Sequence, residues 1–504
     1  MTYGACVMTR RWHLRFALLA TTATCFTATA AGLTPAAAAD LTKYANQPLT
    51  WEKCSGELEC AKLTVPRDYA DLAAGDIQIA LSRVPHSGST FQGSIVVNPG
   101  GPGGSGIDFA SSVASFVAPE VSQQFDIVGF DPRGVAASAP VTCMTGEQTT
   151  RWLLADPTPD TRSEQDRLMR LARKISAGCL QYSPRIAPFI STANTVNDLD
   201  IMRSALGEQK LNLLGFSYGT SLGALYAQEF PSHVGRMVLD GAVDPSLNGM
   251  EISKGQSGGF QGALVRFAKD CANRSDCPYF GDENDVLAGI NRLLADLEKY
   301  RLPTNGFEPL NQSQAVIALF WSMYSPDFWG TLRSALREAR LGQGGELQWM
   351  SNQATNRVGK NRYGSNQNSA FYAISCLDAP ATPGRHGLAV AAKAWSKNAA
   401  VPELARAMSW GNSPCSFWFD HLGGKPAAVT STTTAPIVIV GTRFDPATPY
   451  SWAKALHEQL ATSSLITFEG DGHTAYGGGS ACVDRAIDKF LLTGTAPARK
   501  KTCK

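Results

Sequence analysis

Residues 211–225 read LNLLGFSYGTSLGAL: an apolar run, a G-x-S-x-G pentapeptide and a run of small residues. The apolar run is typical of a buried strand, and the segment after it favours a closely packed helix. Glycines on both sides of Ser217 suit a sharp strand-to-helix turn, because side chains there would collide with neighbouring backbone. Such a turn strains the central residue and exposes its side chain. We therefore predict that Ser217 is a nucleophile at the end of a strand.

A second pentapeptide, GQSGG at residues 255–259, fits the same pattern. The residues before Ser257 are mostly polar, and no apolar run leads into it. Because the turn must connect a strand to a helix, context favours Ser217 over Ser257.

Strand-like runs recur on both sides of this turn. Most are continuous apolar segments, which is typical of strands covered on both faces. Helical patterns lie between them, at residues 195–206, 451–460 and 483–492. This alternation predicts an α/β fold with a mostly parallel sheet and helices on both faces. The expected strands are Ile77–Val84, Ser94–Asn98, Phe125–Phe130, Leu211–Gly215, Arg236–Asp240, Pro436–Gly441 and Leu465–Phe468.

The strand rhythm stops between about Pro245 and Thr434, where the chain reads as helices and loops. Because strands resume afterwards, we predict a helical cap, residues 246–434, inserted into the sheet domain. The domain itself would comprise residues 40–245 and 435–504. The alternative is an independent second domain.

A serine hydroxyl needs a base to attack a carbonyl group. The serine turn and the α/β alternation together predict the α/β-hydrolase fold, in which the acid and the histidine follow the serine in that order. Five histidines follow Ser217, but only His473 lies in a glycine-rich loop directly after a strand-like run. Asp445 stands after the preceding run, whereas Asp471 is too close to His473 in sequence to come from a separate strand end. We predict the catalytic triad Ser217, Asp445 and His473.

A glycine-rich loop, NPGGPGGSG at residues 98–106, follows the expected strand 94–98. Glycines let backbone N–H groups approach a developing negative charge. We expect the amides of Gly101 and Tyr218 to form an oxyanion hole. The alternative, a phosphate-binding loop, lacks the G-K-[ST] ending.

The N-terminus predicts export. Arg10, Arg11 and Arg15 precede a moderately apolar stretch, and alanines 36–39 suit signal-peptidase cleavage, so residues 1–39 are interpreted as a signal peptide. Residues 9–15 resemble a twin-arginine signal. A membrane anchor is the alternative, although the stretch is weakly apolar for a spanning helix. A lipid anchor at Cys25 is a further alternative.

Ten of the 12 cysteines remain after residue 39, an even number that suits disulfides in an exported chain. The alternative, metal-binding thiols, is disfavoured because no C-x-x-C pair occurs, and we predict no metal and no cofactor. Proximity along the chain suggests the pairs Cys54–Cys60, Cys143–Cys179, Cys271–Cys277, Cys376–Cys415 and Cys482–Cys503.

Composition is that of a globular protein of 504 residues, with 44% hydrophobic and 17% charged residues. The formal net charge is +2, and the predicted signal peptide carries three of the basic residues and no acidic one. A nearly neutral mature chain argues against nucleic acid or an anionic membrane surface as partner.

Four motifs together resemble the actinobacterial tripeptidyl aminopeptidases, relatives of the prolyl iminopeptidases. The resemblance runs from about Leu49 to Cys503, with two departures: Asn98-Pro99 replaces a histidine before the glycines, and Ala136 replaces a glycine. The motifs are GGPG at 100–103, FDPRG at 130–134, GFSYG at 215–219 and GTRFDPATP at 441–449.

The resemblance implies a secreted serine exopeptidase that releases short peptides, often tripeptides, from a free N-terminus through an acyl-enzyme. Recognition of the substrate α-ammonium group calls for a carboxylate in the cleft. Asp378 is a candidate, with a structural hydrogen bond as its alternative role. Thr448 is expected either to line the cleft or to serve a turn. Two other functions remain open: a carboxylesterase or lipase-like enzyme, and a non-catalytic binding protein.

Overall fold

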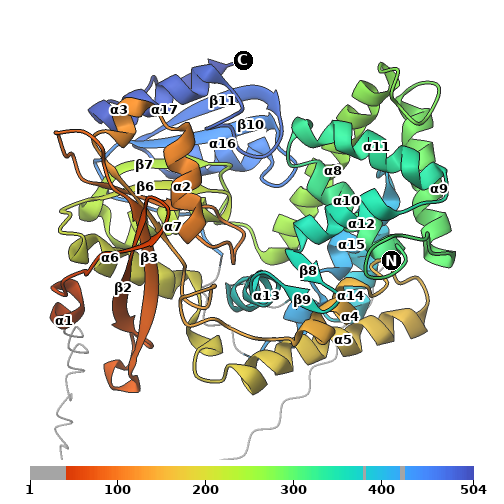
Figure 1. The fold of residues 1–504 in the computed structure, drawn as a ribbon, viewed down its shortest axis with the longest axis horizontal. Helices are drawn as coiled ribbons and strands as arrows, with labels where there is room; N and C mark the ends of the chain where they lie inside the picture. The colour runs from red at the N-terminus through yellow and green to blue at the C-terminus, as the bar shows by residue number, and fades with distance from the viewer. Residues whose placement is uncertain (1–40, 379–381, 420–425) are drawn as a thin grey trace, which may run out of the picture. The chain divides into compact units, whose positions relative to one another are not determined.

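The computed structural model describes residues 41–378, 382–419 and 426–504. Its main sheet contains ten strands in the order β1-β2-β3-β5-β4-β6-β7-β10-β11-β12, and β8 and β9 form a separate pair (Figure 1). The strands are β1 (Glu52–Ser55), β2 (Leu58–Pro66), β3 (Asp76–Val84), β4 (Ser94–Asn98), β5 (Asp126–Phe130), β6 (Leu211–Phe216), β7 (Val234–Asp240), β8 (Arg357–Gly359), β9 (Arg362–Tyr363), β10 (Ile437–Phe444), β11 (Ser463–Asp471) and β12 (Lys500–Cys503).

The main sheet is parallel from β5 through β4, β6, β7, β10 and β11 to β12. The pairs β1–β2, β2–β3 and β3–β5 are antiparallel. Each of the seven strand-like runs coincides with a strand, so the expected α/β fold is confirmed. Sequence patterns missed the outer strands β1, β2 and β12. β12 reads Lys-Lys-Thr-Cys and lies at the edge of the sheet, where burial imposes no apolar run.

Helices connect the strands, and they also make up most of the segment between β7 and β10. They are α1 (Thr42–Ala45), α2 (Ile107–Phe116), α3 (Pro119–Ser122), α4 (Gly146–Leu153), α5 (Arg162–Tyr182), α6 (Thr192–Ala205), α7 (Tyr218–Glu229), α8 (Gly249–Ala272), α9 (Glu283–Lys299), α10 (Gln312–Ser322), α11 (Trp329–Arg340), α12 (Gly345–Ala354), α13 (Gln367–Asp378), α14 (Arg385–Ser396), α15 (Pro402–Trp410), α16 (Tyr450–Gln459) and α17 (Ala481–Thr493). Short 3-10 helices are η1 (Leu72–Ala74), η2 (Ala187–Phe189), η3 (Pro231–His233), η4 (Pro326–Phe328) and η5 (Ser413–Phe417).

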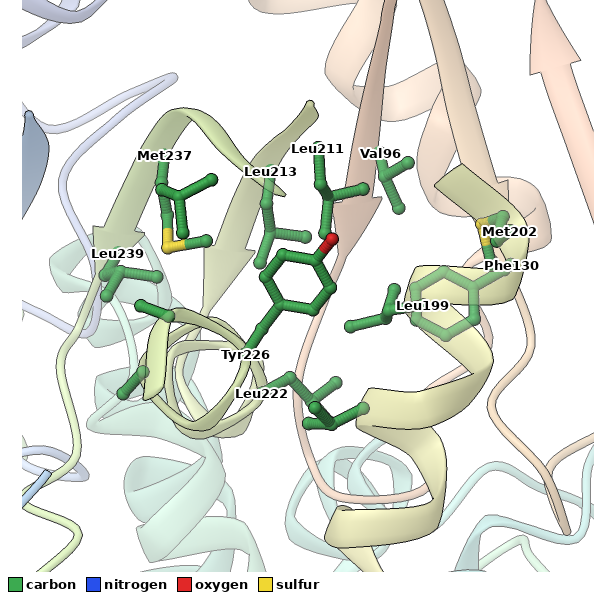
Figure 2. Packing of buried hydrophobic residues seen from close by; sticks show 14 of the residues in the cluster. Val96, Phe130, Leu199, Met202, Leu211, Leu213, Leu222, Tyr226, Met237 and Leu239 are labelled. Carbon is green, nitrogen blue, oxygen red and sulfur yellow. The ribbon is translucent and has the colours of Figure 1, made fainter. Parts of the chain in front are cut away.

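Both faces of the sheet are covered, as the continuous apolar runs predict. Successive side chains of a strand point to opposite faces. Val96 therefore belongs to a core cluster with residues of α6, α7 and α16, whereas its neighbours Ile95 and Val97 belong to a second cluster with residues of α2 and α17. Figure 2 shows the first of these clusters, in which Leu199 of α6 and Leu222 of α7 face the strands. This burial on both sides holds the strand ends in a fixed arrangement.

The region between β7 and β10 has an apolar core of its own. Helices α8 to α12 and α15 bury leucines, alanines and phenylalanines such as Phe267 and Leu336 against one another. α8 begins at Asn248, whose side chain accepts hydrogen bonds from the amides of Met250 and Glu251, a cap typically worth about 1 kcal/mol. The predicted insertion limits, 246–434, stay a prediction.

One segment before the predicted insertion also packs with it. α5 contributes Leu168, Ala172 and Ile175 to a cluster that contains residues of α13 and Trp410 of α15. α4 and α5 therefore join the helices that follow β7, although the sequence places them in the first part of the sheet domain.

The five predicted disulfides are present: Cys54–Cys60, Cys143–Cys179, Cys271–Cys277, Cys376–Cys415 and Cys482–Cys503. Among the described residues, none of the helices combines the length and apolar character needed to cross a bilayer. The predicted signal peptide, residues 1–39, lies outside the described residues.

Candidate active site

Ser217 occupies the turn between β6 and α7, with φ 54° and ψ −123°. Its amide donates a hydrogen bond to the carbonyl of Asp240 at the end of β7, at 2.8 Å. A β-carbon at Gly215 would lie 2.5 Å from the carbonyl oxygen of Gly219, which explains why the turn needs glycine. The competing Ser257 is buried within α8 and has no such turn.

Asp445 and His473 are brought together by two neighbouring parallel strands. Asp445 follows β10 directly, and His473 follows β11 after one glycine. His473 Nδ1 lies 2.9 Å from Asp445 Oδ1 and 3.0 Å from Oδ2. Asp445 is only 3% exposed, and its oxygens also accept from the Ala447 amide and from the amide and hydroxyl of Thr448. The carboxylate is thereby fixed against one edge of the imidazole.

The electrostatics of His473 favour the protonated imidazole. Burial alone would lower its pKa, but the charge of Asp445, the hydrogen bond to it and the charge of Asp240 outweigh burial and raise the pKa above its ordinary value. By contrast, His457 is buried in α16, and its Nδ1 pairs with the hydroxyl of Ser463. This contact gives His457 a structural role.

Ser217 and His473 both lie near the end of β7. A β-carbon at Gly241, the residue after Asp240, would lie 3.1 Å from His473 Cε1 and 3.1 Å from Thr448 Oγ1. Thr448 lines the same cavity as Ser217. In the described part of the chain, no hydrogen bond joins the serine hydroxyl to the imidazole. Such contacts are commonly long in the free enzyme and tighten when substrate binds.

The glycine-rich loop after β4 lies directly against the serine turn. Gly100 has φ +90°, and a β-carbon there would lie 2.5 Å from the Phe216 carbonyl oxygen and 2.9 Å from Ser217 Cβ. The amides of Gly101 and Tyr218 donate to no protein acceptor among the described residues, and both residues line the cavity. Two unsatisfied donors beside a serine are suited to hold an oxyanion.

Buried charges anchor this loop and its neighbour. Asp131 accepts hydrogen bonds from the Ser105 hydroxyl and from the amides of Gly106 and Ala137, at 2.5, 3.1 and 2.9 Å. The FDPRG motif therefore serves structure: its aspartate ties the glycine-rich loop to the loop after β5. Its arginine, Arg133, is fully buried and pairs with Asp198 of α6 at 2.6 Å.

Two residues that the sequence analysis did not select contact the histidine loop. The Tyr324 carbonyl accepts the His473 amide at 2.8 Å, and the two rings meet edge to face with centroids 5.3 Å apart. Asp240 Oδ2 accepts from the amides of Ala475 and Tyr476 at 2.9 and 2.8 Å. Asp240 stands at a strand end and could have been noticed, whereas nothing local marks Tyr324.

Asp240 is a fully buried carboxylate close to the imidazole. Within the described residues its Oδ1 has no hydrogen-bond partner, and burial raises the pKa of this group to about 6. The nearby charge of His473 acts in the opposite direction and lowers it. Asp240 therefore holds the histidine loop and couples electrostatically to its ring.

The cavity beside the serine has a volume of about 550 Å³. It is lined by Ser217, both predicted oxyanion donors, Thr448 and Asp378, along with residues of α7, α8 and α13. The geometry thus places Thr448 both in the cavity and in the turn that binds Asp445, and it places Asp378 on the same cavity. Neither location was settled by the sequence.

A ten-stranded sheet with this strand order and a serine at the sharp turn after β6 defines an α/β-hydrolase. Comparison with known proteins narrows the class. The family model described as TAP-like protein matches residues 401–503, the segment that carries Asp445 and His473.

Curated relatives match nearly the whole chain. Serine protease Hip1 of Mycobacterium tuberculosis is 35% identical over 483 residues, covering 91% of both chains. Tripeptidyl aminopeptidase of Streptomyces lividans is 32% identical, covering 92% of this chain and 87% of its own. Carboxylesterase B of M. tuberculosis is 34% identical, covering 88% and 86%. The chain belongs to this tripeptidyl aminopeptidase-like family of α/β-hydrolases.

Proposed function

We propose that this protein is a serine exopeptidase that releases short peptides, tripeptides foremost, from the free N-terminus of peptides or proteins. Ser217 is the nucleophile, His473 the base and Asp445 the acid. The observation that carries this proposal is the contact between Asp445 Oδ1 and His473 Nδ1, which lie 2.9 Å apart. Both residues follow strands at the sheet edge where Ser217 occupies a strained turn beside a cavity.

The mechanism follows from the hydrogen bonds. The carboxylate of Asp445 accepts a hydrogen bond from Nδ1 of His473, so the neutral imidazole carries its proton on Nδ1. Nε2 is then free to act as a base. His473 accepts the proton of the Ser217 hydroxyl as the oxygen attacks the substrate carbonyl carbon. It then gives that proton to the leaving amine as the C–N bond breaks. Water hydrolyses the acyl-enzyme by the same sequence, which restores the serine.

The oxyanion of each tetrahedral intermediate is held by the amides of Gly101 and Tyr218. Removing one such donor typically costs about 2.7–4 kcal/mol of transition-state stabilisation. Tyr218 is the first residue of α7, so the positive end of that helix adds to the effect.

The choice of peptide substrates rests on the relatives named serine protease and tripeptidyl aminopeptidase. We further propose that the helices of residues 246–434 cap the cleft and restrict it to peptide ends. Export of the mature chain is supported by its five disulfides, which form in oxidising compartments.

A second candidate function is ester hydrolysis, because one relative is named carboxylesterase and the same machinery cleaves esters. The deciding experiment compares a tripeptidyl p-nitroanilide, with a free or an acetylated N-terminus, with p-nitrophenyl butyrate. We expect turnover of the free peptide anilide well above that of the blocked one. Ester turnover without anilide turnover would establish the esterase, and equal anilide rates would remove the exopeptidase claim.

The catalytic assignment is tested with a fluorophosphonate probe, which reacts with activated serines. We expect one label, on Ser217, and none in Ser217→Ala. Absence of labelling in the folded wild type would indicate a non-catalytic binding protein, the third function that the sequence leaves open.

A further inference from the structure

A carboxylate that the proposed mechanism does not use lines the same cavity as Ser217. Asp378 is the last residue of α13 and is partly buried. Its Oδ1 accepts the Thr192 amide at 3.1 Å, and its Oδ2 accepts the Thr192 hydroxyl. The same hydroxyl bonds the phenol of Tyr218. Asp378 is therefore connected through one threonine to the residue that follows the proposed nucleophile.

Asp378 differs from Asp198 and Asp445 in having no ion-pair partner among the described residues, and it differs from Asp131 and Asp240 in lining the cavity. Asp198 pairs with Arg133, and Asp445 pairs with His473. Asp378 has no basic side chain as ion-pair partner in the part of the chain that the structure describes. Burial raises its pKa to about 6, and its hydrogen bonds to Thr192 only partly offset that rise. A buried carboxylate in this position therefore lacks a cation to balance its negative charge.

The surroundings of Asp378 fit a cationic ligand. Among the described residues that line the cavity there is no lysine, arginine or histidine, whereas Glu229 and Asp244 are present. Asp244 already accepts from the amide and hydroxyl of Ser246 and from Gln459. Glu229 is exposed. Among the described residues, Asp244 and Asp378 both combine burial, cavity access and lack of a basic partner. Only Asp378 is also hydrogen bonded, through Thr192, to the residue that follows Ser217.

We propose that Asp378, oriented by Thr192, binds the α-ammonium group of the peptide substrate. This assignment rests on the proposed exopeptidase function and deepens it. An ammonium group offers three N–H donors and one charge, and a charge-assisted hydrogen bond to a carboxylate is about twice as strong as a neutral one. Because Thr192 also bonds Tyr218, the ammonium site and the oxyanion site share one hydrogen-bonded unit.

The test compares kcat/KM for a tripeptidyl p-nitroanilide with a free and with an acetylated N-terminus, in the full chain. Wild type should prefer the free substrate by at least about tenfold, equivalent to about 1.4 kcal/mol. Asp378→Asn preserves shape and an acceptor for Thr192, and it should bring the ratio close to one. Glu229→Gln removes a charge from the same cavity and serves as the matched comparison; it should keep most of the preference.

Two results would overturn the assignment: an unchanged ratio in Asp378→Asn, or an equal loss in Glu229→Gln, which would indicate a general effect of cavity charge. A third substrate, acetylated and with lysine at the cleaved position, separates the α-ammonium from a side-chain ammonium. If Asp378→Asn impairs only this substrate, Asp378 binds the side chain and the assignment fails.

A measurement on the wild type tests the ammonium site without any variant, so it remains valid if Asp378→Asn does not fold. Hydrolysis of p-nitrophenyl butyrate is followed in the presence of a tripeptide whose N-terminus is free or acetylated. We expect the free tripeptide to inhibit with a Ki at least about tenfold lower. Equal Ki values would refute the ammonium site even if peptides are cleaved. Conversely, ester turnover without any peptide cleavage would refute the exopeptidase function. The ratio of Ki values for the free and the acetylated tripeptide would still show whether the cavity binds an α-ammonium group.

Discussion

The substitution Asp445→Asn tests the proposed triad through one hydrogen bond. Asp445 Oδ1 accepts two backbone amides, those of Ala447 and Thr448, at 2.9 and 2.8 Å. The asparagine oxygen should keep this position, because two buried donors would otherwise lose their acceptor. The NH2 group then takes the place of Oδ2, which lies 3.0 Å from His473 Nδ1. An NH2 donor at this position favours Nδ1 as an acceptor, in competition with Oδ1, which lies 2.9 Å from Nδ1 and can still accept its N–H.

The consequence is a change of tautomer. The imidazole proton moves to Nε2, so the nitrogen needed to deprotonate Ser217 is already protonated. The same change in a serine protease triad lowers kcat by about 10⁴-fold, or about 5.5 kcal/mol in the barrier. Stability should change less, by about 1–3 kcal/mol. The new conflict is with the amide of Thr474, a donor 3.3 Å from Oδ2, whereas the Thr448 hydroxyl, which donates to Oδ2 at 2.9 Å, can turn and accept instead.

The assay is kcat/KM on the free-N-terminus peptide anilide, with the thermal midpoint measured in parallel. Asp471→Asn provides the matched control, because Asp471 ends β11, two residues before His473, but pairs with Arg266 of α8. We expect less than about a tenfold loss for the control. A folded Asp445→Asn protein that keeps kcat/KM within tenfold of wild type would refute the assigned acid and direct attention to Asp240.

Four further predictions concern Gly100, Asp240 and the Cys482–Cys503 disulfide. Gly100→Ala should lower kcat by at least about tenfold, because its β-carbon would lie 2.5 Å from the Phe216 carbonyl oxygen. Gly258→Ala is the control and should leave kcat unchanged, because no atom lies within 4 Å of the added β-carbon. Equal kcat values in the two variants would contradict the packing argument. The raised pKa of Asp240, about 6 against 3.8 when unfolded, means that the folded state binds the extra proton. Its contribution to stability is complete below pH about 4 and is lost as pH rises through 6, so the thermal midpoint of wild type minus that of Asp240→Asn should decrease over this range; a difference that is constant with pH would argue against it. The same variant should shift the acid limb of kcat/KM to lower pH, because Asp240 raises the pKa of His473. Replacing Cys482 and Cys503 by serine, which opens a loop of 21 residues, should lower the free energy of unfolding by about 3 kcal/mol with little change in kcat at 25 °C, and urea unfolding monitored by fluorescence tests this.

Local patterns were sufficient for the seven central strands of the sheet and for the turn that carries the serine. The seven apolar runs became strands because a strand buried on both faces must be apolar throughout, and this requirement is visible in any single run. The GFSYG turn was recognisable because its glycines avoid collisions with the adjacent backbone. The order of serine, acid and histidine then selected Asp445 and His473, whose side chains the structure brings into contact.

Contacts across long sequence distances had no such local signal. The Tyr324 carbonyl meets the amide of His473, and Thr192 joins Asp378 to Tyr218, although each pair is far apart in the chain. The packing of α5 with α13 is likewise a contact between distant segments, and the periodicity within either helix does not reveal it. Residue type and spacing follow from the requirements of one strand, helix or turn. Which elements lie side by side, and which buried carboxylate is left without a counter-ion, emerges only when the whole chain packs into one core.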